Sequence, residues 1–257
     1  MNTQTQTQKI ALITGGSRGL GRNTAESLAR KGVDSVITYH SRADEAQAVV
    51  AKLQAGGRKA VALQLDTGAT KTFAGFAESL KKALQDTWDR GSFDYLVNNA
   101  GISHHAAFDQ VTEEELDNLY QVHFKGVFFL TQKLLPLISD GGRIVMLSSG
   151  TTRIIFPGSG AYASMKGAIE ILTLYLAKEL GPRRIAVNTV APGAIATDFS
   201  GGMVRDNPEV NKIVADMTAL GRAGLPDDIG PVIASLLSED NRWVNAQRIE
   251  VSGGMSI

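Results

Sequence analysis

The chain has 257 residues, a length that suits one large α/β domain or two small ones. Its 26 acidic and 26 basic residues balance, so no net field favours nucleic acid or an anionic membrane, and the absence of cysteine excludes disulfides, thiolate catalysis and cysteine-bound zinc. No apolar run has the length of a membrane span, and the polar residues 1–8 lack the apolar segment of a signal peptide. We therefore expect a disordered tail at residues 1–8 and a cytoplasmic protein with neither a nucleic-acid nor a membrane partner.

Short apolar runs alternate with amphipathic stretches from residue 9 onward. The apolar runs are rich in Val, Ile and Leu, which is typical of parallel strands covered on both faces. We expect strands at residues 9–14, 33–39, 59–66, 93–99, 142–149, 184–192 and 248–254. The intervening periodicity predicts helices at residues 20–31, 43–55, 71–87, 113–137, 161–180 and 226–237. This alternation predicts an α/β fold, a Rossmann-type doubly wound parallel sheet with helices on both faces.

No linker-like change of composition divides residues 9–257, so we expect one domain. Residues 198–218 interrupt the alternation with glycines, Pro208 and apolar side chains. We interpret this segment as a mobile lid, with an ordinary surface excursion as the alternative.

The sequence TGGSRGLG joins the first predicted strand to the first predicted helix. In this setting the backbone N–H groups and the positive end of the helix can receive phosphates. Gly15 permits a tight turn, Gly19 lets the backbone approach a pyrophosphate, and Gly21 lets the helix pack closely. A strand–helix turn also favours glycine for purely steric reasons. The position between strand and helix nevertheless favours a dinucleotide site, with Ser17 and Leu20 among its contacts.

The end of the second predicted strand indicates which dinucleotide is bound. An NAD site commonly places Asp or Glu there, about twenty residues past the glycine loop, but Tyr39, His40 and Ser41 supply no carboxylate. Arg18 in the loop and Arg42 just past the strand would attract a 2′-phosphate. We therefore predict NADP(H) in preference to NAD(H), the alternative being that both arginines are simply solvated.

Tyr162 and Lys166 are spaced i, i+4 in a predicted helix and therefore share one face. A free tyrosine has a pKa of about 10, and a nearby ammonium group lowers it, so Tyr162 is a candidate general acid or base. Ser149 ends a predicted strand at the edge where doubly wound folds bind ligands, and its hydroxyl is a candidate donor to a substrate oxygen. A surface Tyr–Lys pair is the alternative, because this spacing often arises by chance.

Several motifs together resemble those of the single-domain short-chain dehydrogenase/reductases, over nearly the whole chain from Lys9 onward. The matching stretches are TGGSRGLG (14–21), NNAG (98–101), Ser149, YASMK (162–166), PGAIAT (192–197) and GRAGLPDDI (221–229). The resemblance implies that Tyr162 is the catalytic acid/base and that Ser149 polarises the carbonyl. It also implies that Lys166 holds the nicotinamide ribose and lowers the Tyr162 pKa.

The resemblance further implies a set of cofactor contacts and no metal. Asp66 matches the position that contacts adenine, and Ile195 and Thr197 match positions that hold the carboxamide. The remaining contacts that it implies are Thr67, Asn98, Ala100, Gly101, Pro192 and Gly193.

One position departs from the family pattern. Where relatives carry an asparagine that positions a water linked to the lysine, the stretch VHFKGVFF places His123. A histidine can donate or accept through either ring nitrogen, so a proton relay can survive, and it can also titrate near neutral pH. We predict that His123 belongs to the relay; the alternative is a tolerated helix residue with the water path lost or rerouted.

Other candidates have weaker assignments. His104 and His105 lack acidic partners at metal-ligand spacing, so we expect loop residues near the substrate entrance, or a solvated pair. Four apolar side chains are candidates for a substrate pocket, with core or interface packing as the alternative; these are Phe156, Phe199, Met203 and Val204.

We therefore expect an NADP(H)-dependent oxidoreductase that transfers hydride between nicotinamide and a ketone or secondary alcohol, that is, a carbonyl reductase or alcohol dehydrogenase. A non-catalytic NADP-binding sensor or scaffold on the same fold is one alternative. An enoyl reductase is a second, disfavoured because those relatives space the tyrosine and lysine more widely. The apolar C-terminal strand predicts a homo-oligomer, as in the family, with a tetramer of D2 symmetry expected.

Overall fold

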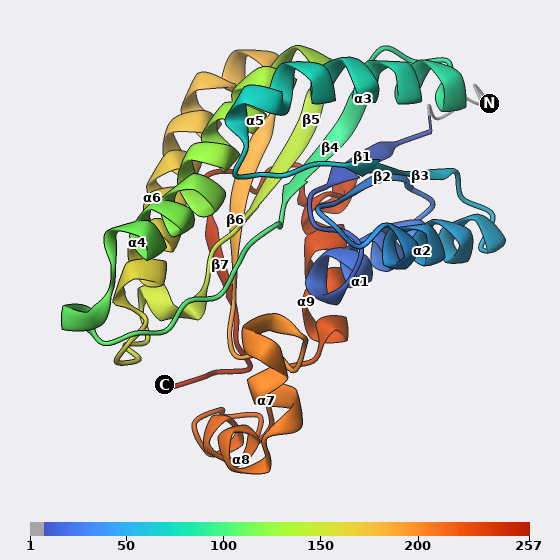
Figure 1. Ribbon diagram of the computed structural model, residues 1–257. Helices are drawn as coiled ribbons and strands as arrows, with labels where there is room; N and C mark the ends of the chain where they lie inside the picture. The colour runs from blue at the N-terminus through green and yellow to red at the C-terminus, as the bar shows by residue number, and fades with distance from the viewer. Residues whose placement is uncertain (1–7) are drawn as a thin grey trace.

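The computed structural model describes residues 8–257, and within them seven parallel strands form one sheet in the order β3-β2-β1-β4-β5-β6-β7 (Figure 1). The strands are β1 (Ile10–Ile13), β2 (Asp34–Tyr39), β3 (Ala60–Gln64), β4 (Phe93–Asn98), β5 (Ile138–Leu147), β6 (Ala186–Pro192) and β7 (Arg248–Val251). Every strand that the sequence predicts is present, and the doubly wound α/β fold is confirmed. The tail expected at residues 1–8 falls, except for Gln8, outside the described residues.

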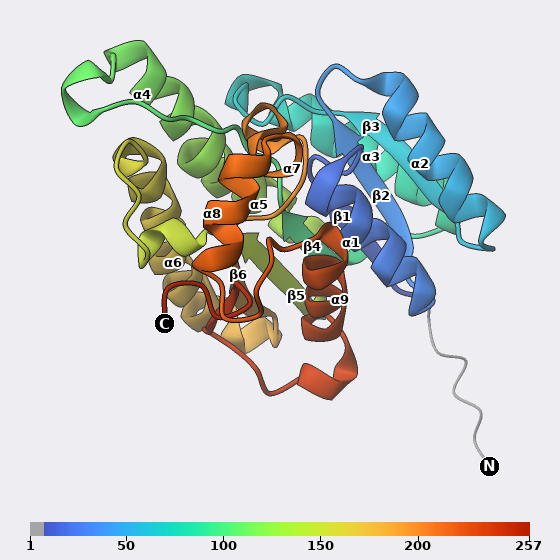
Figure 2. The same cartoon turned by 90° about the horizontal axis from the view of Figure 1, so that it is seen from below.

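Helices cover both faces of the sheet (Figure 1). One layer contains α1 (Gly19–Arg30), α2 (Ala43–Ala55) and α9 (Pro226–Leu236); the other contains α3 (Phe73–Trp88), α4 (Glu113–Tyr120), α5 (Gly126–Leu134) and α6 (Gly160–Glu179). The short helices α7 (Met203–Asp206) and α8 (Pro208–Asp216) belong to neither layer. In Figure 1 both helices lie below the sheet, and Figure 2, which is seen from below, shows them across that end of it.

The central strand β1 shows why its sequence is apolar throughout. Successive side chains of a strand point to opposite faces. Ile10 and Leu12 pack in the core under α3, α5 and α6, whereas Ala11 and Ile13 pack in the core under α1, α2 and α9. All four are fully buried, so a polar residue at any of them would be buried against one helix layer or the other.

The continuous helix expected at residues 113–137 is wrong in detail. The segment consists of α4, a π-helical turn at Gln121–Lys125, α5 and a short 3₁₀ turn at Leu135–Leu137. A π-turn accommodates one extra residue and locally rotates the helix, and such turns are frequent at functional sites. Here the turn contains His123, whose side chain is buried.

Because every strand is parallel, all carboxyl ends meet at one edge of the sheet. The chain runs outward from β1 to β3 and then returns to the other side of β1 with β4, so the strand order reverses between β1 and β4. Open α/β sheets bind ligands in the crevice at such a reversal. The loops that follow β1, β4, β5 and β6 border this crevice, and α7 and α8 lie over it (Figure 2).

Candidate active site

A cavity of about 1140 Å³ occupies the carboxyl edge of the sheet. Residues from the glycine turn, the strand ends, α6 and the α7–α8 segment line it. Of the site residues predicted from the sequence, the cavity wall contains Gly15, Ser17, Arg18, Gly19, Leu20, Tyr39, His40, Arg42, Asp66, Thr67, Ala100, Gly101, His123, Ser149, Tyr162, Lys166, Pro192, Gly193, Ile195 and Thr197. The fold thus gathers residues from most of the chain length around one space.

The turn between β1 and α1 has a geometry that suits phosphate. Gly15 and Gly19 have φ values of +64° and +53°, a left-handed conformation that favours glycine. A Cβ atom on Gly21 would lie 2.2 Å from the carbonyl oxygen of Gly15, so α1 can begin this close to the turn only with glycine there. Within residues 8–257 no side chain caps the first turn of α1. Its N–H groups therefore remain free to bind an anion.

Three cationic or potentially cationic side chains surround the end of β2. Arg42 pairs with Glu45 at 2.6 Å, Arg18 lies 3.9 Å from Asp198, and His40 lies 3.6 Å from Asp66. All of these side chains are substantially exposed, so the pairs are weak and the cations can turn toward a ligand. The surface here is suited to a phosphate, because no carboxylate lies at Tyr39, His40 or Ser41.

Asn98 departs from its predicted role as a cofactor contact. It ends β4 as a buried residue outside the cavity wall, and its amide donates to Thr131 Oγ1 at 3.0 Å. The neighbouring Asn99 lines the cavity and donates to the carbonyl oxygens of Thr14 (2.8 Å) and Gly15 (3.2 Å), which fixes the glycine turn. Adjacent residues of a strand point to opposite sides, which explains why Asn99 and not Asn98 faces the cavity.

Ser149 follows β5 and opens a short 3₁₀ turn, Gly150–Thr152. Its Oγ accepts hydrogen bonds from the backbone N–H of Thr151 at 3.2 Å and from the Thr151 hydroxyl at 3.0 Å. Since these bonds use the acceptor positions of Ser149 Oγ, its own O–H is the donor in the hydrogen bond to Tyr162, and the same O–H can donate to a ligand oxygen placed beside both hydroxyls.

The phenol ring of Tyr162 lies between two other rings of the site. The ring centroid of His123 is 5.2 Å away and that of Phe199 is 6.2 Å away. Burial raises the pKa of Tyr162 to about 12, and contact with the Ser149 hydroxyl opposes this rise only in part. The pKa of Tyr162 is therefore raised rather than lowered overall, because loss of solvent destabilises the phenolate more than its neighbours stabilise it.

Lys166 lies one turn after Tyr162 on α6, as the sequence spacing requires. Its Nζ donates to the carbonyl oxygen of Leu147 at 2.8 Å and lies 5.7 Å from the Tyr162 ring centroid. Burial lowers the pKa of Lys166 to about 7, so its positive charge is only partial near neutral pH.

His123 is fully buried beneath the phenol. Its Nε2 donates to the carbonyl oxygen of Ile102 at 2.8 Å and lies 3.2 Å from the Ile102 nitrogen. Within the described residues its Nδ1 has no hydrogen-bond partner. Burial, and then the charge of Lys166, lower the pKa of His123 to about 3. The expectation that His123 can titrate near neutral pH is wrong, because the buried imidazole stays neutral there.

The cavity has a partly apolar wall. The four predicted pocket residues, Phe156, Phe199, Met203 and Val204, all line it, as do His104 and His105. Met255 also lines the cavity, and the following residue, Ser256, donates its N–H to the Met217 carbonyl oxygen at 2.8 Å. The sequence carried no signal for Met255, because only the fold brings the last residues beside the α7–α8 segment.

Two findings concern the described residues as a whole. Among residues 8–257 no group of three or more histidine, aspartate or glutamate side chains is placed to hold a metal ion. Over the same residues no helix is long and apolar enough to span a membrane.

Comparison with known proteins identifies the class. A family profile described as Enoyl-(Acyl carrier protein) reductase matches residues 15–256. An uncharacterized oxidoreductase of Methylorubrum extorquens is 38% identical, with 96% of this chain and 97% of the relative aligned. Versicolorin reductase 1 of Dothistroma septosporum is 33% identical over 96% of this chain and 95% of its own. The chain belongs to the short-chain dehydrogenase/reductase family of oxidoreductases.

A solved structure supports the same family and contains a bound cofactor. The angucycline C-6 ketoreductase LanV, crystallised with bound NADP, superposes with a TM-score of 0.92 at 36% identity, covering 96% of this chain and 95% of LanV. The family assignment made from the sequence motifs is thereby confirmed.

Proposed function

We propose that the protein is an NADP(H)-dependent ketoreductase that interconverts a ketone and a secondary alcohol. The observation that carries the proposal is the placement of Ser149, Tyr162 and Lys166 on one wall of a cavity whose other end is formed by the glycine turn. The ketoreductase LanV, with its bound NADP, and versicolorin reductase 1 support the same reaction class.

The residues present suit the cofactor. The uncapped first turn of α1 would bind the pyrophosphate, and Arg18 and Arg42 would pair with a 2′-phosphate. Asp66 would contact the adenine, and Ile195 and Thr197 would hold the carboxamide. When bound, NADPH supplies a hydride from its nicotinamide ring.

The side chains of the chain perform the proton chemistry. Ser149 would donate its O–H to the substrate oxygen as negative charge develops there. Tyr162, whose raised pKa keeps it protonated near neutral pH, would give its proton to the same oxygen. Lys166 would bind the nicotinamide ribose, and the unpartnered Nδ1 of His123 would accept a hydrogen bond from a water of the relay that returns a proton to Tyr162.

The lining of the cavity favours a bulky aromatic ketone. Its apolar part includes Phe156, Phe199, Met203 and Ile213, and apolar surfaces of this kind suit flat rings better than charged chains. The relatives named above include reductases of versicolorin and angucycline substrates. We therefore propose a fused-ring aromatic ketone as the substrate class.

Kinetics with a ketone panel test this function. The protein should oxidise NADPH with a bicyclic aromatic ketone such as 2-tetralone and should prefer it to an acetoacetyl ester by kcat/KM. Tyr162→Phe should lower kcat by about 10²–10⁴-fold, because it removes the proton donor while leaving the ring in place. Binding of NADPH without turnover of any ketone would instead support the non-catalytic sensor.

The proposal extends to the α7–α8 segment and to assembly. Residues 198–218 would act as the lid, since several of them line the cavity and α7 and α8 lie across the end of the sheet (Figure 2). Large apolar side chains on α5 and α6 are exposed, including Phe129 (43%), Ile171 (57%) and Tyr175 (64%). Apolar surface of this extent suits a subunit interface, which supports a D2 homotetramer. Light scattering coupled to size-exclusion chromatography would give the mass of a monomer if this is incorrect.

A further inference from the structure

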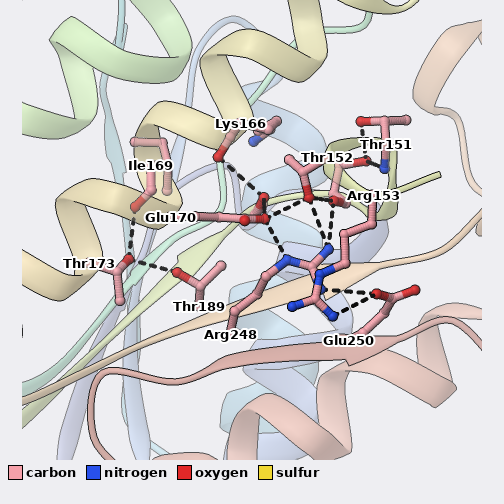
Figure 3. A network of polar contacts seen from close by, with 12 residues as sticks. Thr151, Thr152, Arg153, Lys166, Ile169, Glu170, Thr173, Thr189, Arg248 and Glu250 are labelled. Carbon is pink, nitrogen blue, oxygen red and sulfur yellow. Dashed lines mark hydrogen bonds and ion pairs between the residues drawn. The ribbon is translucent and has the colours of Figure 1, made fainter. Parts of the chain in front are cut away.

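The turn that contains Ser149 is fastened to two elements distant in the sequence. Glu170 lies on α6 and Arg248 lies on β7, and their side chains meet beside the turn (Figure 3). The strand β6 lies between β5 and β7, so Arg248 reaches past β6 to the turn that follows β5. Nothing in the proposed reaction uses either charge directly.

One oxygen of Glu170 accepts three hydrogen bonds. Its Oε1 accepts from Ser148 Oγ at 2.7 Å, from Thr152 Oγ1 at 2.8 Å and from Arg248 Nε at 2.7 Å. Ser148 and Thr152 lie on the two sides of Ser149 in the sequence. The carboxylate therefore holds both ends of the turn that carries the Ser149 hydroxyl.

Arg248 holds the same turn from β7. Its Nη2 donates to the backbone carbonyl oxygen of Ser149 at 3.3 Å and to Thr152 Oγ1 at 2.9 Å, and its Nη1 donates to Glu250 at 3.0 Å. The guanidinium group is planar with fixed donor directions, so it restrains the turn more tightly than an ammonium group would.

Stability alone is a weak explanation for this pair. The side chains of Arg248 and Glu170 are only 11% and 19% exposed. The cost of removing such charges from water commonly cancels most of their attraction, so apolar residues of similar size often stabilise a fold equally well. What apolar residues cannot reproduce is the set of directed bonds to the turn.

We propose that Glu170 and Arg248 are positioning residues for Ser149. The pair fixes the backbone at and around Ser149, so that its hydroxyl donor stays aimed at the substrate oxygen. This inference rests on the proposed function, in which Ser149 donates to that oxygen. A misplacement of about 1 Å reduces an enzymatic rate on the order of 10²-fold, so loosening the turn should be visible in kcat.

The test is a cycle between the pair and Ser149. The double variant Glu170→Leu/Arg248→Met removes both charges together. In this variant the Thr152 hydroxyl can still donate to the carbonyl oxygen of Ser149, which lies 3.0 Å away. The kcat of the double variant should fall by about 10-fold or more, while the Kd for NADPH, measured by fluorescence, stays within about 2-fold. In a Ser149→Ala background the same double variant should change kcat by less than about 3-fold, because there is no hydroxyl left to position.

The single variant Arg248→Lys keeps the charge and should retain part of the activity. If the double variant does not fold, Arg248→Lys is combined with Ser149→Ala in the same cycle. Arg143→Met is the matched control: Arg143 is 5% exposed in the middle of β5, where it donates to backbone carbonyls and pairs with Glu239 at 3.2 Å. This control should lower Tm and leave kcat unchanged.

Two outcomes overturn the inference, and they are distinct. An unchanged kcat in the double variant, or an equal loss with and without Ser149, would show that the pair is only structural. A Ser149→Ala variant with full activity would instead remove the catalytic assignment of Ser149, and the inference with it.

Discussion

The imidazole of His123 meets the phenol ring of Tyr162 edge-on, with centroids 5.2 Å apart and ring planes at 90°. The π-helical turn at Gln121–Lys125 contains the imidazole, and its Nε2 is bound to the Ile102 carbonyl oxygen. Because burial lowers the pKa of His123 to about 3, the group beside the phenol is a neutral imidazole with one free acceptor, Nδ1.

Replacing His123 tests the relay. His123→Asn should keep kcat within about 3-fold, because an amide can bond both the N–H and the carbonyl of Ile102 and still accept from a water. His123→Ala should lower kcat by about 10-fold or more, since it deletes the acceptor and leaves a gap beneath Tyr162. The measurement is the pH–rate profile of kcat for wild type and both variants. Indistinguishable profiles and rates in all three would exclude a relay through His123.

His123 should also make the fold acid-sensitive. Its folded-state pKa of about 3 lies below the ordinary value of 6.5, so the unfolded chain binds a proton that the folded chain does not. The stability from this group is complete above pH 6.5 and is lost as the pH falls toward 3, by up to about 1.4 kcal/mol per pH unit. Between pH 7 and pH 5 the free energy of unfolding, measured with urea, should fall less for His123→Asn than for the wild type, by about 2 kcal/mol.

The exposed His40 provides the control, because His40→Asn removes a histidine without altering the core. Parallel pH dependence in wild type and His123→Asn would contradict the buried neutral state of His123.

The raised pKa of Tyr162 predicts different pH dependence for the two directions of reaction. Ketone reduction needs the protonated phenol, so its kcat should show no loss from Tyr162 ionisation up to about pH 9. Alcohol oxidation needs the phenolate, so its kcat should rise with pH, by about tenfold per unit while proton transfer limits the rate. Stopped-flow rates in both directions check this, and an oxidation rate that levels off near pH 7 would show that bound cofactor lowers the phenol pKa.

Arg42 should determine the preference for NADPH. Arg42→Asp replaces an attractive charge with a repulsive one near the expected 2′-phosphate, so KM for NADPH should rise by about 10-fold or more, and KM for NADH should change by less than about 3-fold. The loss should shrink at high salt, because Arg42 is exposed and its charge is screened. Arg22→Ala is the matched control, since Arg22 pairs with Glu26 on α1 and does not line the cavity. Wild-type preference for NADH would contradict the assignment of both Arg18 and Arg42.

The sequence by itself determined the local elements. Periodicity gave α2 its observed bounds, Ala43–Ala55, and the apolar runs gave every strand, because burial of both faces of a parallel sheet leaves a direct mark on composition. The glycine turn and the Tyr162–Lys166 spacing were also readable, since each depends on residues close together in the chain.

The tertiary structure alone decided what depends on surroundings. Burial moved the pKa of Tyr162 up rather than down and kept His123 neutral, and desolvation depends on atoms contributed by the whole fold. Packing between distant segments likewise decided three further features. One helical pattern became α4, a π-turn and α5, and Asn99 rather than Asn98 came to line the cavity. The third feature is the pairing of Glu170 with Arg248. Local sequence carries the preferences of neighbours along the chain, whereas the charge, solvent and contacts of a site are set by groups that only folding brings together.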